Sequence, residues 1–270
     1  MADLESQVQR EPEAADAQPQ LRVLFRDARL LIVDKPSGLL VHRGWGRDEV
    51  TAVDLAAEIA DGPVHPVHRL DRATSGILVF ALDPEATRVL QSRWHDGVDK
   101  RYLALVRGRV VSTWTSAVRE VDHPIPKTED GPRIPAVSSM RALADAEAAR
   151  CALVEVRPHT GRLHQVRRHL KHLFAPVVGD VRYGDGRVNR AFRTEWQLRR
   201  LALHAWRLGF EHPFEDLRLD LRCPPSGELA AALAALGLPS TPESDDPAMD
   251  RPATPQVQPE DITSIDQSDR

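Results

Sequence analysis

Cysteine is scarce in this chain of 270 residues, which has only Cys151 and Cys223 and no C-x-x-C spacing. The sequence therefore offers neither a disulfide framework nor a zinc site built from thiolates. No apolar run approaches the ~18 residues that a transmembrane helix needs. The first twenty residues are polar and acidic, unlike a secretory signal peptide. We therefore expect a cytoplasmic protein without a membrane partner.

Two common nucleotide-binding motifs are also absent. The chain contains no G-x-G-x-x-G sequence, which is typical of dinucleotide-binding folds, and no G-x-x-x-x-G-K-[ST] phosphate-binding loop. The sequence therefore argues against an enzyme that depends on a dinucleotide or on a nucleoside triphosphate.

Acidic residues are concentrated at the two ends of the chain, so the overall net charge does not reflect the positive charge of the body of residues between them. The net charge is −4, but residues 1–20 carry −4 and residues 238–270 carry −6, which leaves +6 for residues 21–237. All eleven histidines lie within this body. A basic body suits an anionic partner such as nucleic acid, although a mildly basic surface is more often only solvated.

The same compositional change predicts three regions. The tail, 238–270, is rich in proline, serine, threonine and aspartate and has no sustained periodicity, so we expect it to be disordered and to bury little apolar surface. The acidic head, 1–20, is expected to be disordered for the same reason. The body, 21–237, has no internal linker and no repeat, which predicts a single domain.

Short β-rich runs alternate irregularly with a few helices in this body. Strands are predicted at residues 30–34, 77–82, 102–107, 152–156, 201–210 and 217–221. Helices are predicted from Asp83-Pro84 to about His95, from Ser226 to Gly237, and over 162–173, where apolar residues share one face. This order indicates an α+β fold with a mixed or antiparallel sheet flanked by helices and loops.

Three polar segments are difficult to explain by packing alone. Residues 68–76 read H-R-L-D-R-A-T-S-G and place Asp71 among arginines just before an apolar strand. Residues 100–108 read K-R-Y-L-A-L-V-R-G and present Tyr102 near a strand start. Residues 159–170 read H-T-G-R-L-H-Q-V-R-R-H-L and lead into a basic helix. One Asp–Arg pair is usually structural, but three such segments together favour a functional site.

These segments resemble the sequence marks of the RluA-type family of RNA pseudouridine synthases. The family motifs are H-R-L-D-x-x-T-S-G, K-x-Y-x-A-x-V-x-G and T-G-R-x-H-Q-x-R, and all three stand here in order. The resemblance includes V-D-K-P-S-G-L-L-V-H at 33–42, P-V-V-G-D at 176–180 and L-H-A at 203–205, and it spans roughly 23–224. It implies one pseudouridine synthase catalytic domain that isomerises uridine to pseudouridine in RNA.

The resemblance also implies a role for each matching residue. Asp71 corresponds to the carboxylate that attacks ribose C1′ or stabilises its positive charge, and Arg167 to the arginine that pairs with it and favours its charged form. Tyr102 corresponds to the tyrosine that stacks on the target base and can assist removal of its C5 proton. Leu203 corresponds to an apolar residue on the cavity floor. Without the resemblance, each of these residues has an ordinary structural explanation. Neither a metal nor an organic cofactor is implied.

Further residues are expected to contact the RNA. A uracil stacked in RNA must leave the stack to reach a buried carboxylate, and Arg69 corresponds to the family residue that fills the vacated space. A phosphate contact is the alternative for Arg69. We expect Arg162, His164 and Gln165, all from the third segment, to bind the substrate as well.

Two finer features concern the substrate. The run V-H-R-G-W at 41–45 and the pattern G-D-x-x-x-G-D-x-x-x-N-R at 179–190 resemble a subgroup that acts on uridine 65 of tRNA. Ribosomal RNA is the alternative substrate, because the match is loose between 110 and 149. We expect the protein to act as a monomer.

Two rival functions use the same residues. A catalytically inactive RNA-binding protein is disfavoured by the intact Asp71, Tyr102 and Arg167. A metal-dependent hydrolase would need ligands from histidine-rich stretches, and the spacing of the second set fits one helical face poorly. The two candidate ligand sets are His65, His68 and Asp71, and His164, His169 and His172.

Overall fold

The computed structural model describes residues 19–43, 49–94, 97–114, 118–128, 131–242 and 249. Most of the predicted head and tail, His95 at the expected end of one helix, and Gly44 and Trp45 of the V-H-R-G-W run lie outside the described residues. Among the described residues, no helix is both long and apolar enough to cross a membrane.

Within the described residues, ten strands form one sheet in the order β1-β2-β4-β11-β5-β10-β9-β6, with β12 paired to β11 and β3 to β4. Strands β4 and β11 are parallel, whereas β11 and β5 are antiparallel, so the predicted mixed sheet and α+β class are confirmed. The strands are β1 (Arg22–Arg26), β2 (Leu30–Lys35), β3 (His65–Pro66), β4 (Ser75–Ala81), β5 (Asp99–Arg107), β6 (Arg119–Asp122), β9 (Val137–Ala146), β10 (Cys151–Pro158), β11 (Leu203–Glu211) and β12 (Arg218–Arg222), with β7 (Ile125–Pro126) and β8 (Arg133–Ile134) in a separate pair.

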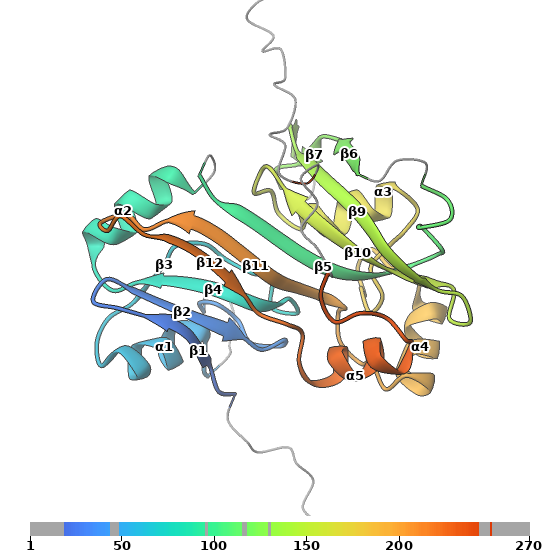
Figure 1. Cartoon of the computed structure of the whole chain (residues 1–270), viewed down its shortest axis with the longest axis horizontal. Helices are drawn as coiled ribbons and strands as arrows, with labels where there is room; N and C mark the ends of the chain where they lie inside the picture. The colour runs from blue at the N-terminus through green and yellow to red at the C-terminus, as the bar shows by residue number, and fades with distance from the viewer. Residues whose placement is uncertain are drawn as a thin grey trace, which may run out of the picture.

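Helices cover the sheet at both ends. Figure 1 shows α1 and α2 at one end of the molecule and α4 and α5 at the other, with α3 beside β9 and β10. The helices are α1 (Ala52–Ala60), α2 (Pro84–Arg93), α3 (Gln165–His172), α4 (Gly186–Glu195) and α5 (Gly227–Ala235). The three predicted helices are present, but α3 begins at Gln165 and not at Arg162. The side chain of Asp83 accepts from the Ala86 amide, as its predicted N-cap role requires.

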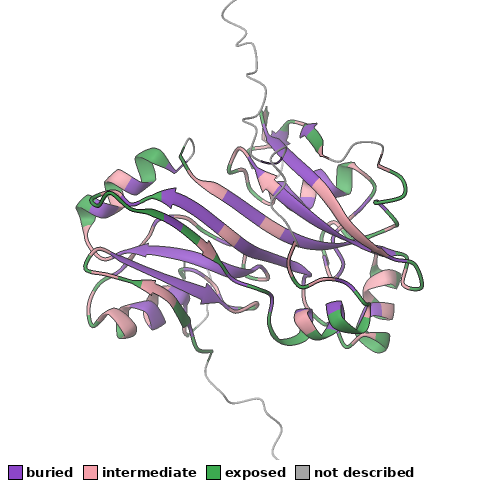
Figure 2. Cartoon of the chain, viewed as in Figure 1, coloured by how far each residue is buried: buried purple, intermediate pink, exposed green. Residues whose placement is uncertain are grey.

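The central strands are buried on both faces, as the purple ribbons of Figure 2 show. Successive residues of β2 belong to different apolar clusters: Leu31 packs with Leu55 of α1, and Leu30 packs with Leu90 of α2. A strand covered on both faces has no polar alternation, which explains its continuous apolar sequence.

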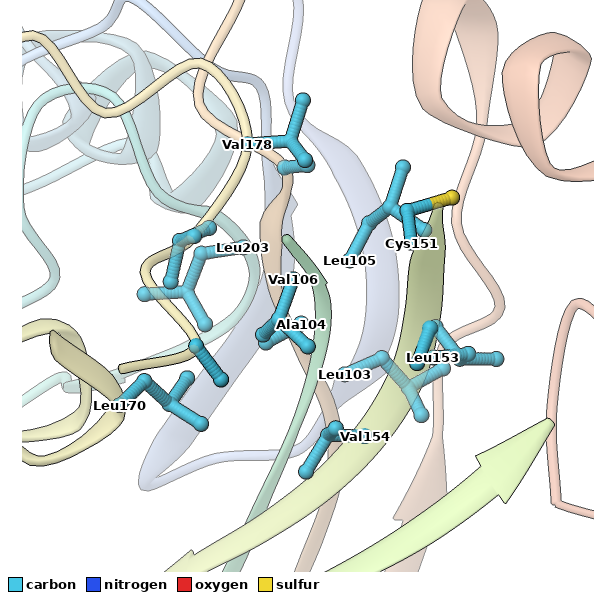
Figure 3. Packing of buried hydrophobic residues seen from close by; sticks show 14 of the residues in the cluster. Leu103, Ala104, Leu105, Val106, Cys151, Leu153, Val154, Leu170, Val178 and Leu203 are labelled. Carbon is cyan, nitrogen blue, oxygen red and sulfur yellow. The ribbon is translucent and has the colours of Figure 1, made fainter. Parts of the chain in front are cut away.

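A third cluster fixes α3 against the sheet. It joins Leu103 of β5, Leu153 of β10 and Leu203 of β11 to Leu170 of α3 (Figure 3). All four side chains are at most 3% exposed. Because α3 carries Arg167 and β5 carries Tyr102, this core sets the distance between two of the predicted site residues.

Gly76 allows β4 and β11 to meet beside the loop that holds Asp71. It has a φ of +110°, and a Cβ at this position would overlap the carbonyl of Ala205 on β11. Only glycine fits both conditions. The glycine of the first motif therefore has a packing reason in addition to its place in the motif.

Two described residues of the predicted tail are buried and make contacts with the rest of the protein. Leu238 is 6% exposed, and its amide donates to the carbonyl of Leu233 at the end of α5. Met249 is fully buried, and Arg157 Nη1 on β10 donates to its carbonyl at 2.6 Å. The tail therefore has at least one contact with the sheet beyond the predicted domain end.

We expect Met249→Ala to lower the free energy of unfolding by about 2 kcal/mol, because a buried methionine side chain is lost. Urea denaturation measures the change. Met249→Leu is the matched control and should cost less, because it nearly conserves volume. A chain ending at Asp250 should have the same free energy of unfolding as the full chain, since the residues removed are mostly polar. If Met249→Ala and the wild type were equally stable, the contact between Met249 and the domain would be contradicted.

Candidate active site

One cavity of about 450 Å³ lies between the loop before β4, strands β5 and β11, and the start of α3. Every residue predicted for the site lines it. These are Arg69, Asp71, Tyr102, Arg162, His164, Gln165, Arg167 and Leu203. The structure thus brings together residues that are up to 134 positions apart, and the three motifs meet at one place.

Asp71 lies in a turn just before β4, where its carbonyl accepts from the Thr74 amide. Arg167 Nη1 donates to Asp71 Oδ2 at 2.9 Å. The other side of the same guanidinium makes two bonds to Asp180, from Nε to Oδ2 at 2.7 Å and from Nη2 to Oδ1 at 2.9 Å. Arg167 is therefore held between two carboxylates, and its orientation toward Asp71 is fixed from behind.

Asp180 is the fully buried member of this group, whereas the Asp71 side chain is 22% exposed toward the cavity. Burial alone would raise the pKa of Asp180, but bonds from Arg167 and from the amides of Tyr183 and Arg182 keep that pKa below its ordinary value. Asp180 therefore stays charged and neutralises part of the Arg167 charge.

The Asp71 turn is tied to the loop that follows β2. Lys35 is fully buried, and its Nζ donates to the carbonyls of Leu39 at 2.8 Å and Arg72 at 3.2 Å. Ser37 Oγ donates to the carbonyl of Ala73 at 2.7 Å. Burial, together with the charge of Arg200, lowers the pKa of Lys35 to about 7. These bonds give the D-K-P-S-G sequence a structural purpose: it holds the turn that carries Asp71.

Tyr102 and Leu203 come from adjacent central strands. Tyr102 on β5 lies opposite Ala205 on β11, and Leu203 lies opposite Ala104. Burial, reinforced by the charge of Asp71, raises the pKa of Tyr102 well above its ordinary value. The tyrosine is thus a protonated aromatic wall of the cavity at neutral pH.

His164 precedes α3 with its backbone in the left-handed region, at φ 54° and ψ 27°. Its Nε2 lies 3.7 Å from Asp71 Oδ2, and its Nδ1 lies 3.0 Å from the hydroxyl oxygen of Tyr183. Burial is the main cause that lowers the pKa of His164, and Arg167, Arg182 and Arg168 lower it further, whereas Asp71 acts in the opposite direction. The imidazole is therefore neutral near pH 7.

Gln165 lines the cavity but directs its polar atoms into the protein. Its Oε1 accepts from Thr160 Oγ1 at 2.7 Å and from the Arg162 amide at 3.0 Å, and its Nε2 donates to Val137 and Ser138. These bonds tie the loop before α3 to the start of the helix and join it to β9. The hydrogen-bonding capacity of Gln165 serves to hold the loop, and its expected contact with the substrate stays a prediction.

The two predicted arginines at the cavity mouth differ. Arg69 is exposed and makes no side-chain hydrogen bond or ion pair within the described part of the chain. Arg162 Nε donates to the carbonyl of Pro135 at 3.0 Å. Arg69 thus has its whole guanidinium available to a ligand, whereas Arg162 is partly engaged.

Neither histidine set proposed for a metal forms a cluster. His68 stacks on Trp94 at 4.6 Å and accepts from the Val79 amide. His169 is fully buried between Ser138 and the carbonyl of His123. Among the described residues, the metal-compatible group is Asp27, His212 and Glu215, away from the cavity lining. The geometry therefore gives the metal-dependent hydrolase no support at this site.

Three residues of the site have roles that the sequence did not predict. Asp180, Tyr183 and Lys35 belong to segments that matched the family motifs, but the segments alone gave no role to each side chain. One usable signal was present for Asp180, because an acid that directly follows an apolar run is commonly buried only when it is paired.

The sequence was compared with known proteins. Residues 29–172 match the family described as RNA pseudouridylate synthase. A tRNA pseudouridine synthase C of Pasteurella multocida is 40% identical over 223 residues, covering 74% of this chain and 90% of the relative. One of Salmonella typhimurium is 40% identical over 216 residues, covering 72% of this chain and 81% of the relative.

Solved structures give the same result. Human RNA Pseudouridylate Synthase Domain Containing 4 is 26% identical with a TM-score of 0.66, and the match covers 82% of this chain and 95% of that one. Human RNA Pseudouridylate Synthase Domain Containing 1, at 23% identity and a TM-score of 0.60 over 84% and 98% of the two chains, shows the fold alone. With three motifs meeting in one cavity and a family match across more than half of its length, this chain belongs to the RNA pseudouridylate synthase family.

Proposed function

We propose that this protein isomerises uridine to pseudouridine in tRNA, at uridine 65, and acts as a monomer in the cytoplasm. The observation that carries the proposal is the Asp71 carboxylate, partly exposed in a cavity and bonded to Arg167. The names of the bacterial relatives favour tRNA as the substrate. The basic body favours an RNA partner, because phosphate contacts supply most of the affinity for nucleic acids.

In the proposed reaction, Asp71 attacks ribose C1′ or balances its positive charge while the C1′–N1 bond breaks. The electron pair of that bond stays on the uracil. The ring then turns, and C5 bonds to C1′ as any bond to Asp71 breaks. The C5 proton is lost to solvent and N1 takes up a proton from solvent, so the product is an isomer of uridine. Arg167, held by Asp180, keeps the Asp71 carboxylate in place through these steps.

Tyr102 is proposed as the stacking partner of the base. Its raised pKa leaves the phenol protonated near neutral pH, so it is a poor proton acceptor. An aromatic wall beside the catalytic carboxylate can hold a flipped uracil in a sandwich with Leu203 below. This argument favours stacking over the assistance in proton removal that the resemblance implied.

Arg69 is proposed to occupy the space that the flipped nucleotide leaves. It lies at the cavity mouth and is exposed, and it precedes Asp71 by only two residues, which is close enough to act at the same nucleotide. Extraction of a base costs a few kcal/mol, which a side chain inserted into the stack can partly offset.

Release of tritium from tRNA labelled at uridine C5 tests the reaction directly. We expect stoichiometric release in the presence of excess chelator. A metal-dependent hydrolase would stop, and a non-catalytic binding protein would release nothing. Mapping pseudouridine in tRNA and rRNA from cells with and without the protein then tests the substrate: loss confined to tRNA position 65 supports the proposal, and loss in rRNA overturns the choice of RNA.

Arg69→Ala should slow the reaction on structured tRNA by roughly tenfold or more, and much less on a short unstructured RNA of the same local sequence, because unstacking costs less there. Single-turnover rates on both RNAs at several salt concentrations measure this. Arg190→Ala, an exposed arginine on α4, is the matched control; as a phosphate contact it should weaken both substrates equally and lower the salt slope by about one. Equal losses for Arg69→Ala on both RNAs would contradict the wedge role.

A further inference from the structure

The backbone of His164 is unusual for the start of a helix. A non-glycine residue in the left-handed region is uncommon, and such residues are concentrated at functional sites. The His164 side chain makes no capping bond to α3, and the Arg162 amide is satisfied by Gln165 instead. The imidazole is therefore not used to cap α3, and it lies between Asp71 at the cavity and Tyr183.

A chain of hydrogen bonds favours one of the two nitrogens of His164 as the site of the proton. Arg168 Nε can only donate, and it lies 2.8 Å from the Tyr183 oxygen. The single hydroxyl proton of Tyr183 is then free to be donated, and His164 Nδ1 lies 3.0 Å away. Nδ1 is the acceptor in this arrangement. A neutral imidazole has one N–H, so its proton is on Nε2, which faces the cavity.

Three observations support this assignment. The lowered pKa of His164 makes the neutral form dominant near pH 7. The Tyr183 ring is fixed edge-on to the imidazole at 5.6 Å, with the guanidinium carbons of Arg167 and Arg168 5.1 and 5.5 Å from the ring centroid. The chain also contains a second arrangement of the same kind, at His204.

In that second arrangement, Arg200 Nη2 lies 2.7 Å from Ser75 Oγ, and Ser75 Oγ lies 2.7 Å from His204 Nδ1. His204 Nε2 lies 2.7 Å from the carbonyl of Cys223. The arginine donates to the hydroxyl, the hydroxyl to Nδ1, and Nε2 donates to a carbonyl oxygen. The His164 chain has the same order but ends at the cavity, where a carbonyl oxygen of a ligand would take the place of the Cys223 carbonyl.

We propose that His164 is a catalytic residue that donates a hydrogen bond from Nε2 to O2 of the flipped uracil, with Tyr183 and Arg168 as positioning residues. The inference rests on the proposed function. Nε2 lies 3.7 Å from Oδ2 of Asp71, the carboxylate proposed to act at C1′. O2 is on the ring carbon next to N1, so it is the uracil carbonyl nearer to C1′. Negative charge spreads onto O2 when the C1′–N1 bond breaks, and a fixed donor there stabilises the leaving uracil.

The tautomer can be tested on the full-length protein without RNA. A ¹⁵N spectrum of histidine-labelled protein is recorded at neutral pH, and the His164 signals are those missing from the spectrum of His164→Gln. These signals should show an unprotonated Nδ1 and a protonated Nε2. Tyr183→Phe should abolish this preference, because the donor to Nδ1 is removed. A protonated Nδ1 in the wild type would overturn the inference whatever the activity.

The contact to O2 is tested with RNA containing 2-thiouridine or 4-thiouridine at the target position, since sulfur is a poor acceptor. Single-turnover rates of bound enzyme should fall roughly tenfold more for the 2-thio than for the 4-thio substrate with the wild type. His164→Ala should be slow on uridine and should lose this difference, whereas His164→Gln, which retains a donor, should recover part of both.

The outcomes separate the two levels of the proposal. Conversion of uridine by the wild type with the same 2-thio and 4-thio rates would overturn the role of His164 and leave the proposed function standing. Absence of conversion of any RNA would overturn the proposed function and the assigned ligand together. The melting temperature and RNA affinity of each variant show whether a slow rate reflects misfolding or weak binding. The ratio of the 2-thio and 4-thio rates, measured on bound enzyme, does not depend on misfolding or on weak binding.

Discussion

Asp71→Asn should reduce turnover by about a thousandfold or more while the RNA affinity and melting temperature stay close to those of the wild type. The amide nearly matches the carboxylate in shape and can still accept a bond from Arg167, which lies 2.9 Å from Asp71 Oδ2. It cannot attack C1′ or balance its positive charge. Tritium release under single-turnover conditions, with RNA binding measured separately, distinguishes loss of chemistry from loss of binding.

A second carboxylate provides the matched control. Asp83 caps α2 and pairs with Arg29, away from the cavity lining, and asparagine is an equally good N-cap. Asp83→Asn should therefore retain full turnover. Substantial activity of folded Asp71→Asn would place the chemistry on another residue and remove the central argument for the site.

The sequence predicted the strands that lie in the middle of the sheet, because strands such as β4 and β10 have continuous apolar runs. It missed β9, whose residues alternate small and polar side chains, such as Ser138, Ser139 and Ala144, and are typical of neither element. Pairing with β10 along its whole length makes this segment a strand. That pairing is a tertiary effect which local propensity does not contain.

Helix α1 was missed although its start is encoded locally. Thr51 and Asp54 form a reciprocal capping box, with the Asp54 amide bonded to Thr51 and the Thr51 amide to Asp54. Threonine followed three residues later by aspartate is a less familiar form of this motif than the glutamate form. A search for either acid would have found the helix.

The candidate site was predictable in its members and not in its connections. Asp71 and Arg167 are 96 positions apart, so only the resemblance brought them together. The sequence also does not predict the hydrogen-bond partners of neighbouring side chains. Gln165 and His164 are adjacent, and both are polar residues at the start of α3, yet one points into the protein and the other toward the cavity. The amide of Gln165 bonds to β9 and the imidazole of His164 to Tyr183, and nothing in the sequence marks these partners.

Asp180→Asn should lower turnover by about 100-fold, because small displacements of catalytic groups have effects of this size. Asp180 makes two bonds to Arg167 and accepts from the amides of Arg182 and Tyr183. An asparagine has only one oxygen to accept these bonds, and its NH₂ group faces the remaining donors, which it cannot accept from. Arg167 then loses its fixed orientation toward Asp71. Loss of the buried charge should also lower the free energy of unfolding by about 3 kcal/mol.

The surface pair between Arg207 and Asp220 is a matched control for this effect. It has the same two-bond geometry, at 2.7 and 2.9 Å, but Asp220 is 37% exposed and does not line the cavity. Asp220→Asn should cost about 1 kcal/mol or less and leave turnover unchanged.

A double-mutant cycle then separates positioning from a general loss of stability. If Asp180 acts through Arg167, Asp180→Asn should slow turnover little or not at all in the Arg167→Ala background, because the residue it positions is already absent. Rates are compared per folded, RNA-bound enzyme, below the melting temperature of the double variant. Full additivity of the two losses would mean that Asp180 supports the fold alone and that Asp71 is held in place without it.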